Sequence, residues 1–191
     1  MSLSKTLIRI IMGFSAAILF SASAHAQSTI LVVDTTRVLR ESDVGKHIDR
    51  QMASIKTSVE SELKAKASPL EAQQKSLKAQ YGTQSPQVLQ NDTSFKQKWT
   101  NFQKEGQKFQ IEQRYVDAEL KVTHQKAVSK VQERLRIILK DIVTERNADV
   151  VLERSLVIYG DPADVTDTVI SRLNSQLKTV PVTRERLPRK S

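Results

Sequence analysis

The chain has 191 residues, with 30 lysines and arginines against 21 aspartates and glutamates and a formal net charge of +9. It contains no cysteine, which excludes a disulfide framework, a thiolate metal site and lipid attachment at an N-terminal cysteine. The basic excess favours nucleic acid, anionic lipid or acidic protein as a partner.

The N-terminus is typical of a cleaved export signal. Two basic residues precede an apolar run from Ile10 to Phe20, and small residues follow up to Ala26. The run is shorter than the roughly 20 apolar residues that span a bilayer, which argues against a membrane anchor. We therefore predict cleavage between Ala26 and Gln27 and a soluble periplasmic protein. Export makes nucleic acid the least favoured of the three partners.

The next segment predicts a strand followed by a long helix. Residues 29–34 (TILVVD) form a short apolar, β-branched run that is typical of a buried strand. Asp34 suits a helix start or strand end better than a general base, and Ser42 and Asp43 offer helix N-caps. Apolar residues then recur over 44–63 at steps of three and four, which predicts a helix with one apolar stripe.

A turn is expected after this helix, because Gly82 suits a left-handed C-terminal cap and Ser85 suits an N-cap before a proline. The return helix should run over 86–147, which is roughly 90 Å if straight and longer than a small domain is wide. Pro69 is expected to kink or break the first helix, at a cost of about 3 kcal/mol. Gly106 should lie at a comparable depth on the return helix, which predicts a soft level there.

The C-terminal part predicts short strands, a helix and a tail. Two apolar runs, 150–152 and 156–159, are separated by three polar residues and predict a β-hairpin. Helical spacing returns over 165–177. Residues 181–191 contain two prolines, several basic residues and few apolar ones, so this segment is predicted to be a disordered basic tail.

The predicted fold class is α+β. A small β-rich body of residues 27–43 and 149–180 receives an inserted helical-hairpin arm of residues 44–148, with its tip near 82–85. The body has few residues for an independent core, so association between copies is expected to supply the missing burial.

The mature chain resembles the Skp/OmpH family. The similarity lies in Ile30 to Asp34, Arg37 to Leu39, Ser42 with Gly45-Lys46, Ala148 to Leu152, Val157 to Tyr159, and Asp164 to Thr166. The resemblance implies a homotrimer with an intersubunit β-barrel body and three coiled-coil arms that enclose unfolded outer-membrane proteins. The trimer-body candidates are Ile30, Val32, Val150, Leu152, Val157 and Tyr159.

The distal arm, residues 63–108, concentrates positive charge, with eight lysines against three acidic residues. Such a pattern is usual for a solvated helical face, and it also suits long-range attraction of acidic clients or anionic headgroups. Three aromatic residues lie in or beside the same region, where packing between the arm helices is their alternative role. The candidate client-binding residues are Lys64, Lys66, Lys75, Lys78, Lys96, Lys98, Trp99, Phe102, Lys104, Lys108 and Phe109.

No catalytic or metal-binding constellation is predicted. His47 and His124 lie far apart on the helices, and the sequence has no His-x-x-x-His pair or glycine-rich phosphate loop. We expect no enzymatic activity and no cofactor. The leading hypothesis is an ATP-independent holdase chaperone for unfolded outer-membrane β-barrel proteins. The alternatives are a coiled-coil tether of the cell envelope and a protein that binds lipopolysaccharide or anionic lipid.

Overall fold

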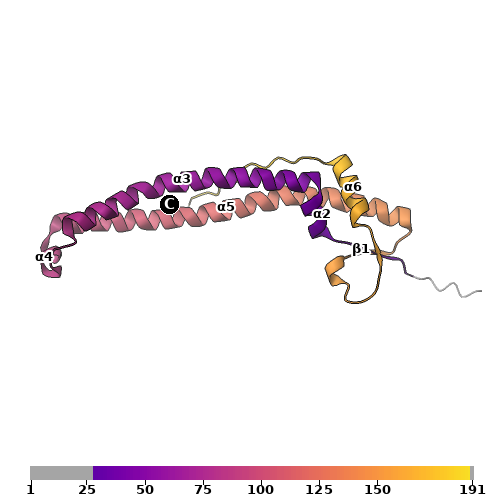
Figure 1. The fold of residues 1–191 in the computed structure, drawn as a ribbon, viewed down its shortest axis with the longest axis horizontal. Helices are drawn as coiled ribbons and strands as arrows, with labels where there is room; N and C mark the ends of the chain where they lie inside the picture. Colours follow the sequence, from indigo (N-terminus) through magenta and orange to yellow (C-terminus); the bar gives the residue numbers. More distant parts are fainter. Residues whose placement is uncertain (1–27, 190–191) are drawn as a thin grey trace, which may run out of the picture.

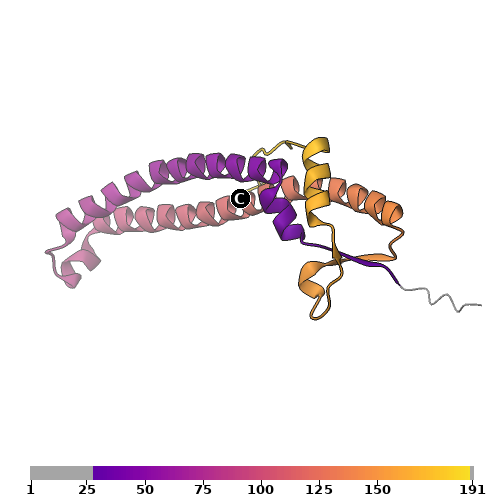
Figure 2. The ribbon, with the colours of Figure 1, turned by 45° about the vertical axis from the view of Figure 1, so that its right-hand side comes forward.

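The computed structural model describes residues 28–189, which form a long arm with a small base at one end (Figure 1). The predicted export signal and its cleavage site between Ala26 and Gln27 lie outside these residues. Two long helices run side by side along the arm, and a small sheet and two short helices lie at the base (Figure 2). None of the helices described is long and apolar enough to cross a membrane.

The sheet of the base has three parallel strands in the order β2-β1-β3. The central strand β1 (Ile30–Val33) was predicted, and its last three side chains are buried. One edge is β2 (Val150–Glu153) and the other is the two-residue strand β3 (Ala163–Asp164). A central strand that is covered on both faces reads as a continuous apolar run, as this one does.

The predicted β-hairpin of residues 150–152 and 156–159 is wrong. After β2 the chain forms a turn of 3-10 helix, η1 (Arg154–Leu156), and then reaches the opposite edge of β1. An ion pair of 2.8 Å between Arg154 and Asp164 closes this loop. Most of the second apolar run is therefore exposed, and it has no strand partner within the protomer. Local apolar character alone did not specify which strand it would join.

Two side-chain caps connect the sheet to the arm, as the sequence predicted. The Asp34 carboxylate accepts a hydrogen bond of 2.7 Å from the backbone N–H three residues later and begins α2 (Thr35–Glu41). The Ser42 hydroxyl accepts a similar bond of 3.2 Å and begins α3 (Asp43–Tyr81). Each cap satisfies a backbone donor that the first helical turn leaves without an intrahelical partner.

Gly45 lies where the start of α3 approaches the end of α2. A Cβ at this position would overlap the carbonyl oxygen of Leu39, so a side chain fits only if the backbone moves. We expect Gly45→Ala to lower the free energy of unfolding by about 1–3 kcal/mol, measured by urea denaturation at one protein concentration. Gly106→Ala is the control, because a Cβ there meets open space. Equal losses in the two variants would contradict this reading of Gly45.

The arm consists of α3 and α5 (Thr93–Arg146), joined at the tip by α4 (Pro86–Asn91). Helix α3 continues through Pro69, so the proline does not break it. Two predictions about the tip are wrong. Gly82 has a right-handed helical conformation with a φ of −68°, not the left-handed one that was expected. The return helix is not continuous, because it is interrupted at Asp92. The Asp92 carboxylate accepts a 3.0 Å hydrogen bond from the backbone N–H three residues later, which starts a new helix there.

One hydrophobic core joins the base to the proximal arm. Its side chains come from β1, α2, the first turns of α3, the last turns of α5, and α6 (Thr166–Gln176). This core therefore includes side chains from both sides of the boundaries predicted at residues 44 and 148. The buried members are Leu31, Val33, Val38, Val44, Ile48, Ala127, Val131, Leu135, Ile138, Ile142, Val165, Val169, Leu173 and Val180.

The C-terminal segment corrects another prediction. Residues 181–189 were expected to belong to a disordered tail, but they lie as an extended segment that runs back from α6 along the arm (Figures 1 and 2). Arg184 and Arg189 of the segment form ion pairs with glutamates of α3 and α5. The composition of the segment is typical of disorder. Its ordered conformation depends on partners more than 60 positions away in the chain, which composition does not reveal.

Candidate functional site

The distal arm carries a row of aromatic rings. Phe95, Trp99 and Phe102 follow one another on α5 at steps of four and three, so they share one helix face. The ring centroids of successive members are 6.1 and 5.7 Å apart, and Tyr81 of α3 extends the row with its ring 5.0 Å from Phe95. These separations are typical of favourable aromatic pairs. We call Tyr81, Phe95, Trp99 and Phe102 the aromatic row.

The aromatic row packs between the helices and also reaches the surface. Phe95 and Phe102 are partly buried, whereas Trp99 is 42% exposed. A groove of about 310 Å³ beside the row is lined by Leu77, Leu89 and Trp99, among others. Packing between the helices, which was the alternative role for these rings, thus describes Phe102 better than Trp99. Trp99 offers apolar surface that the protomer does not bury.

All eight lysines predicted for the distal arm are exposed. Lys98 lies beside the aromatic row. Its ammonium is 5.4 Å from the centroid of the Tyr81 ring and donates a 2.9 Å hydrogen bond to the side-chain oxygen of Gln80. Lys66 forms a 2.8 Å ion pair with Glu112 across the two helices. Among the eight, Lys66 alone has a salt bridge within residues 28–189. The distal arm therefore presents cationic groups and apolar groups on the same element.

Phe109 lies closer to the base than the aromatic row. It lines a second groove, of about 570 Å³, together with Pro69 on the opposite helix and Lys108. Glu105 and Lys108 of α5 line this groove opposite Pro69 of α3. Because Gly106 lies between them in sequence, Pro69 and Gly106 are at the same level of the arm. The structure thus brings Pro69, Lys108 and Phe109 together, and leaves Trp99 and Phe102 in a separate cluster.

The residues predicted for the trimer body differ in exposure. Val32 is fully buried within the protomer, whereas Ile30 is 41% exposed, Val150 is 38% exposed and Tyr159 is 98% exposed. Leu152 and Val157 are partly buried. Sequence reasoning did not select Leu156 and Ile158, which are 68% and 100% exposed. The signal was available, because both belong to an apolar run that was assigned to a strand.

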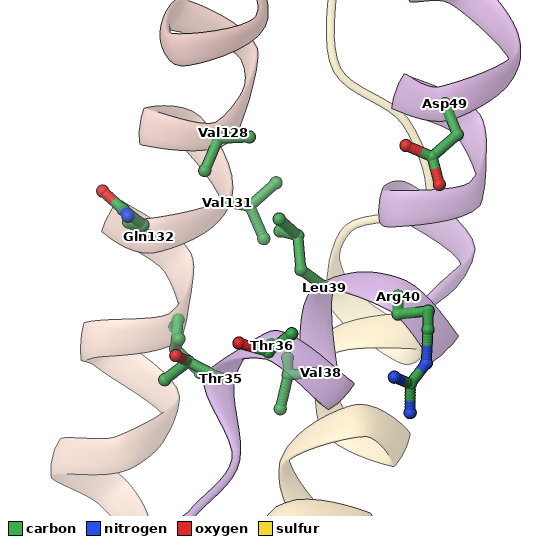
Figure 3. A pocket seen from close by; sticks show the side chains of 10 residues that line it. Thr35, Thr36, Val38, Leu39, Arg40, Asp49, Val128, Val131 and Gln132 are labelled. Atoms are coloured by element: carbon green, nitrogen blue, oxygen red, sulfur yellow. The ribbon is translucent and has the colours of Figure 1, made fainter. Parts of the chain in front are cut away.

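Sequence reasoning also did not predict a cleft at the root of the arm. It has a volume of about 340 Å³ and lies between α2, α3 and α5. Figure 3 shows Leu39 of α2 and Val131 of α5 pointing toward one another across it, with Arg40 and Asp49 on the far side. Thr36 adds a hydroxyl to the lining. The apolar part of its lining comes from α2 and α5, and the remainder of the lining is polar or charged.

The described residues contain no group of three or more histidine, aspartate or glutamate side chains that could hold a metal ion. His47 has a structural partner, because its Nε2 lies 3.1 Å from the carbonyl oxygen of Val180. The arrangement offers apolar grooves and exposed ammonium groups along an extended arm. Such surfaces suit non-covalent binding of a chain with apolar and acidic segments.

Comparisons with known proteins agree with this picture. The family model "Outer membrane protein (OmpH-like)" matches residues 29–173. A search of curated proteins gave no significant match. Among solved structures, a candidate outer membrane chaperone (OmpH-like) from Caulobacter crescentus CB15 is similar with a TM-score of 0.69 and 26% sequence identity. The similarity covers 84% of this chain and 92% of that one. The family match ends within α6, before the extended C-terminal segment.

Proposed function

The chain belongs to the OmpH-like family of non-enzymatic outer membrane chaperones, and on this premise we propose that it is an ATP-independent periplasmic holdase. In this proposal the arms enclose unfolded outer-membrane β-barrel proteins and keep them from aggregating in transit. The observation that carries the proposal is the distal arm, where Trp99 is exposed beside a groove and the same arm segment exposes eight lysines. Adaptable apolar surface that its own protomer does not bury is what a holdase requires.

The proposal is tested by diluting a urea-unfolded porin into buffer with the purified mature protein and no nucleotide. We expect light scattering from porin aggregates to be suppressed and a soluble complex of one client with one trimer to be measurable by mass. The emission of Trp99, the one tryptophan in the chain, should change when the client binds. Unchanged aggregation together with tight binding of a folded envelope protein would favour the tether alternative instead.

We also propose that the protomers assemble as a homotrimer through the base. Two observations support this assembly: the outer strands β2 and β3 are short edge strands, and the loop between them exposes Leu156, Ile158 and Tyr159. Edge strands and contiguous exposed apolar side chains are typical of surfaces that associate. An intersubunit barrel would pair the edges and cover this loop.

Ile158→Asp should weaken the trimer, because it places a charge on a side chain that association would bury. We expect sedimentation velocity at micromolar concentration to show mainly monomer, which corresponds to a loss in affinity of at least about tenfold. Val88→Asp is the matched control, because Val88 is a 54% exposed apolar residue of the arm tip. A wild-type protein that sediments as a monomer, or identical behaviour of both variants, would refute the proposed interface.

The exposed lysines favour anionic lipid or lipopolysaccharide as an additional ligand. Attraction between exposed ammonium groups and phosphate-bearing surfaces is screened over about 10 Å at 0.1 M salt. Binding to anionic vesicles should therefore fall steeply between 0.05 and about 0.5 M salt, whereas client holding that rests on apolar burial should change little. Salt-insensitive vesicle binding would argue against an electrostatic lipid contact.

A further inference from the structure

The segment after α6 is bound to the arm and contacts both of its helices. We call residues 180–189 the strap. Val180, Val182 and Arg184 are buried or partly buried, whereas Pro181 and Thr183 between them are exposed. This alternation is the period of an extended chain with one face on a surface. The strap runs back from α6 along the arm (Figure 2), where it forms hydrogen bonds to both α3 and α5.

The first residues of the strap belong to the core of the base. Val180 is 6% exposed and joins the buried cluster, and Val182 packs against that cluster. The carbonyl oxygen of Val180 lies 3.1 Å from Nε2 of His47 on α3. Prolines at 181 and 188 disfavour a helical continuation of α6 and restrict the strap toward extended conformations. The beginning of the strap is therefore fixed in position on the arm.

Arg184 links the two helices of the arm. Its Nη1 lies 2.8 Å from Oε2 of Glu62 on α3, and its Nη2 lies 2.8 Å from Oε2 of Glu119 on α5. The Arg184 side chain is only 10% exposed, and the Glu119 side chain is fully buried. A planar guanidinium can serve two carboxylates at once, which an ammonium group cannot do with the same geometry.

The other oxygen of Glu119 is also satisfied by the strap. Its Oε1 accepts a 3.0 Å hydrogen bond from the backbone N–H of Leu187 and a further bond from Arg189. The hydroxyl of Thr123 accepts a 2.9 Å hydrogen bond from the backbone N–H of Glu185. A buried carboxylate without partners is very costly. The strap provides every hydrogen bond that the structure shows for the Glu119 carboxylate, so the position of Glu119 is explained only if the strap is bound.

The far end of the strap lies at the level of Glu112. Arg189 is 3.1 Å from this carboxylate and 4.8 Å from the Tyr115 ring centroid, and Lys66 pairs with the same carboxylate from α3. Hydrogen bonds from Arg189 and Lys66 lower the pKa of Glu112 to about 2. The hydrogen bond from Arg184 is the main cause that lowers the pKa of Glu62. These acidic groups therefore stay charged at neutral pH.

We propose that the acidic cluster of Glu62, Glu112 and Glu119 on α3 and α5 is a binding site for the chain's own strap, which locks α3 to α5 and confines opening of the arm to the part beyond it. The soft level formed by Pro69 and Gly106 adjoins the last strap contact, because Pro69 lines a groove of about 570 Å³ together with Glu112, which Arg189 binds. The proximal arm is a rigid stem, and the distal arm carries the movement.

Amide hydrogen exchange of the mature full-length protein without client tests this division. Arg184→Ala removes the link between the helices, so exchange in residues 59–66 and 112–123 should become about tenfold faster. Arg186→Ala is the matched control, because Arg186 is 58% exposed and its nearest carboxylate distances are 3.6 and 3.8 Å. This control should stay within about twofold of the wild-type exchange. Exchange in the distal arm should be the same in both variants.

Three results would overturn the proposal: equal exchange in the two variants, a change spread evenly along the whole arm, or a change confined to the strap itself. If Arg184→Ala does not fold, Arg184→Lys keeps the charge and loses the fork, and it should show the same local increase at a smaller size. Because no client is present, the outcome is independent of the holdase test. A protein could hold clients without a strapped stem, or have the stem and hold nothing.

Discussion

Replacing Trp99 by alanine should lower the affinity for an unfolded outer-membrane β-barrel protein by about tenfold, which is typical for an exposed aromatic anchor. The indole is 42% exposed and lies between Phe95 and Phe102 at centroid distances of 6.1 and 5.7 Å. It can therefore cover client side chains without first being released from the protomer's own packing. Client affinity is measured from the fluorescence of a labelled, urea-unfolded porin titrated with the chaperone.

Ile111→Ala is the control for this substitution. Ile111 lies on the same helix and is 44% exposed, but it is outside the aromatic row. We expect its replacement to change client affinity by no more than about twofold. Trp99→Phe should retain most of the affinity, because it keeps an aromatic surface at this position. Equal losses for Trp99→Ala and Ile111→Ala would show that the aromatic row has no special part in binding.

Replacing Glu119 by glutamine should lower the free energy of unfolding by about 3 kcal/mol at neutral pH, because it leaves two arginines facing a neutral amide. Glu119 is fully buried, and its carboxylate binds Arg184, Arg189 and the backbone N–H of Leu187. Urea denaturation at fixed protein concentration measures the loss. Glu133→Gln is the control, because Glu133 is 64% exposed and its pair with Lys130 spans 3.4 Å, so it should cost about 0.5 kcal/mol or less.

The pH dependence of this loss identifies its cause. Burial raises the pKa of Glu119, but hydrogen bonds from Arg189, Leu187 and Arg184 outweigh it and bring the pKa below its usual value of 4.5. A carboxyl group with a lowered pKa stabilises the fold fully above its unfolded pKa and loses this contribution as pH falls through its folded pKa. The difference between wild type and Glu119→Gln should thus be constant above about pH 5 and shrink below it. A difference that persists unchanged at pH 2 would indicate a packing defect.

Sequence reasoning predicted the parts of the fold that depend on neighbours along the chain. The caps at Asp34 and Ser42 and the apolar stripe from Val44 onward are local patterns, and the structure confirms them. The helix break at Asp92 also depends on local sequence, but it was not predicted. An aspartate can cap a helix, as Asp92 does, or lie within a polar helix. Nothing in the periodicity distinguished these two outcomes.

The remaining misses depend on long-range pairing. The run 156–159 has strand-like composition, but the second strand that pairs with β1, beside β2, is the two-residue segment Ala163–Asp164, whose side chains are exposed. The strap is polar and rich in arginine, and its order depends on Glu119, a residue that resembles any other surface glutamate of an amphipathic helix until the fold buries it. Charge pairing between distant segments leaves no periodic signal in the sequence.

The distal lysines and aromatic residues were selected from the sequence by composition, and their part in client binding stays a prediction. The structure adds how they are distributed: Trp99 and Phe102 form one cluster near the tip, whereas Phe109 lines a separate groove with Pro69. Composition could not separate these groups, because the register of the two helices depends on the tip and on the break at Asp92.

The continuity of α5 has a mechanical consequence. The helix has 54 residues and is therefore about 80 Å long if straight, and its last turns lie in the same core as β1 and α6. It acts as a lever whose short end is embedded in the base. A stem that bent easily would absorb any force on the tip locally, whereas a stiff stem transmits that force to the sheet. A load on the distal arm is therefore carried by α5 to the sheet and to α6 at the opposite end of the molecule.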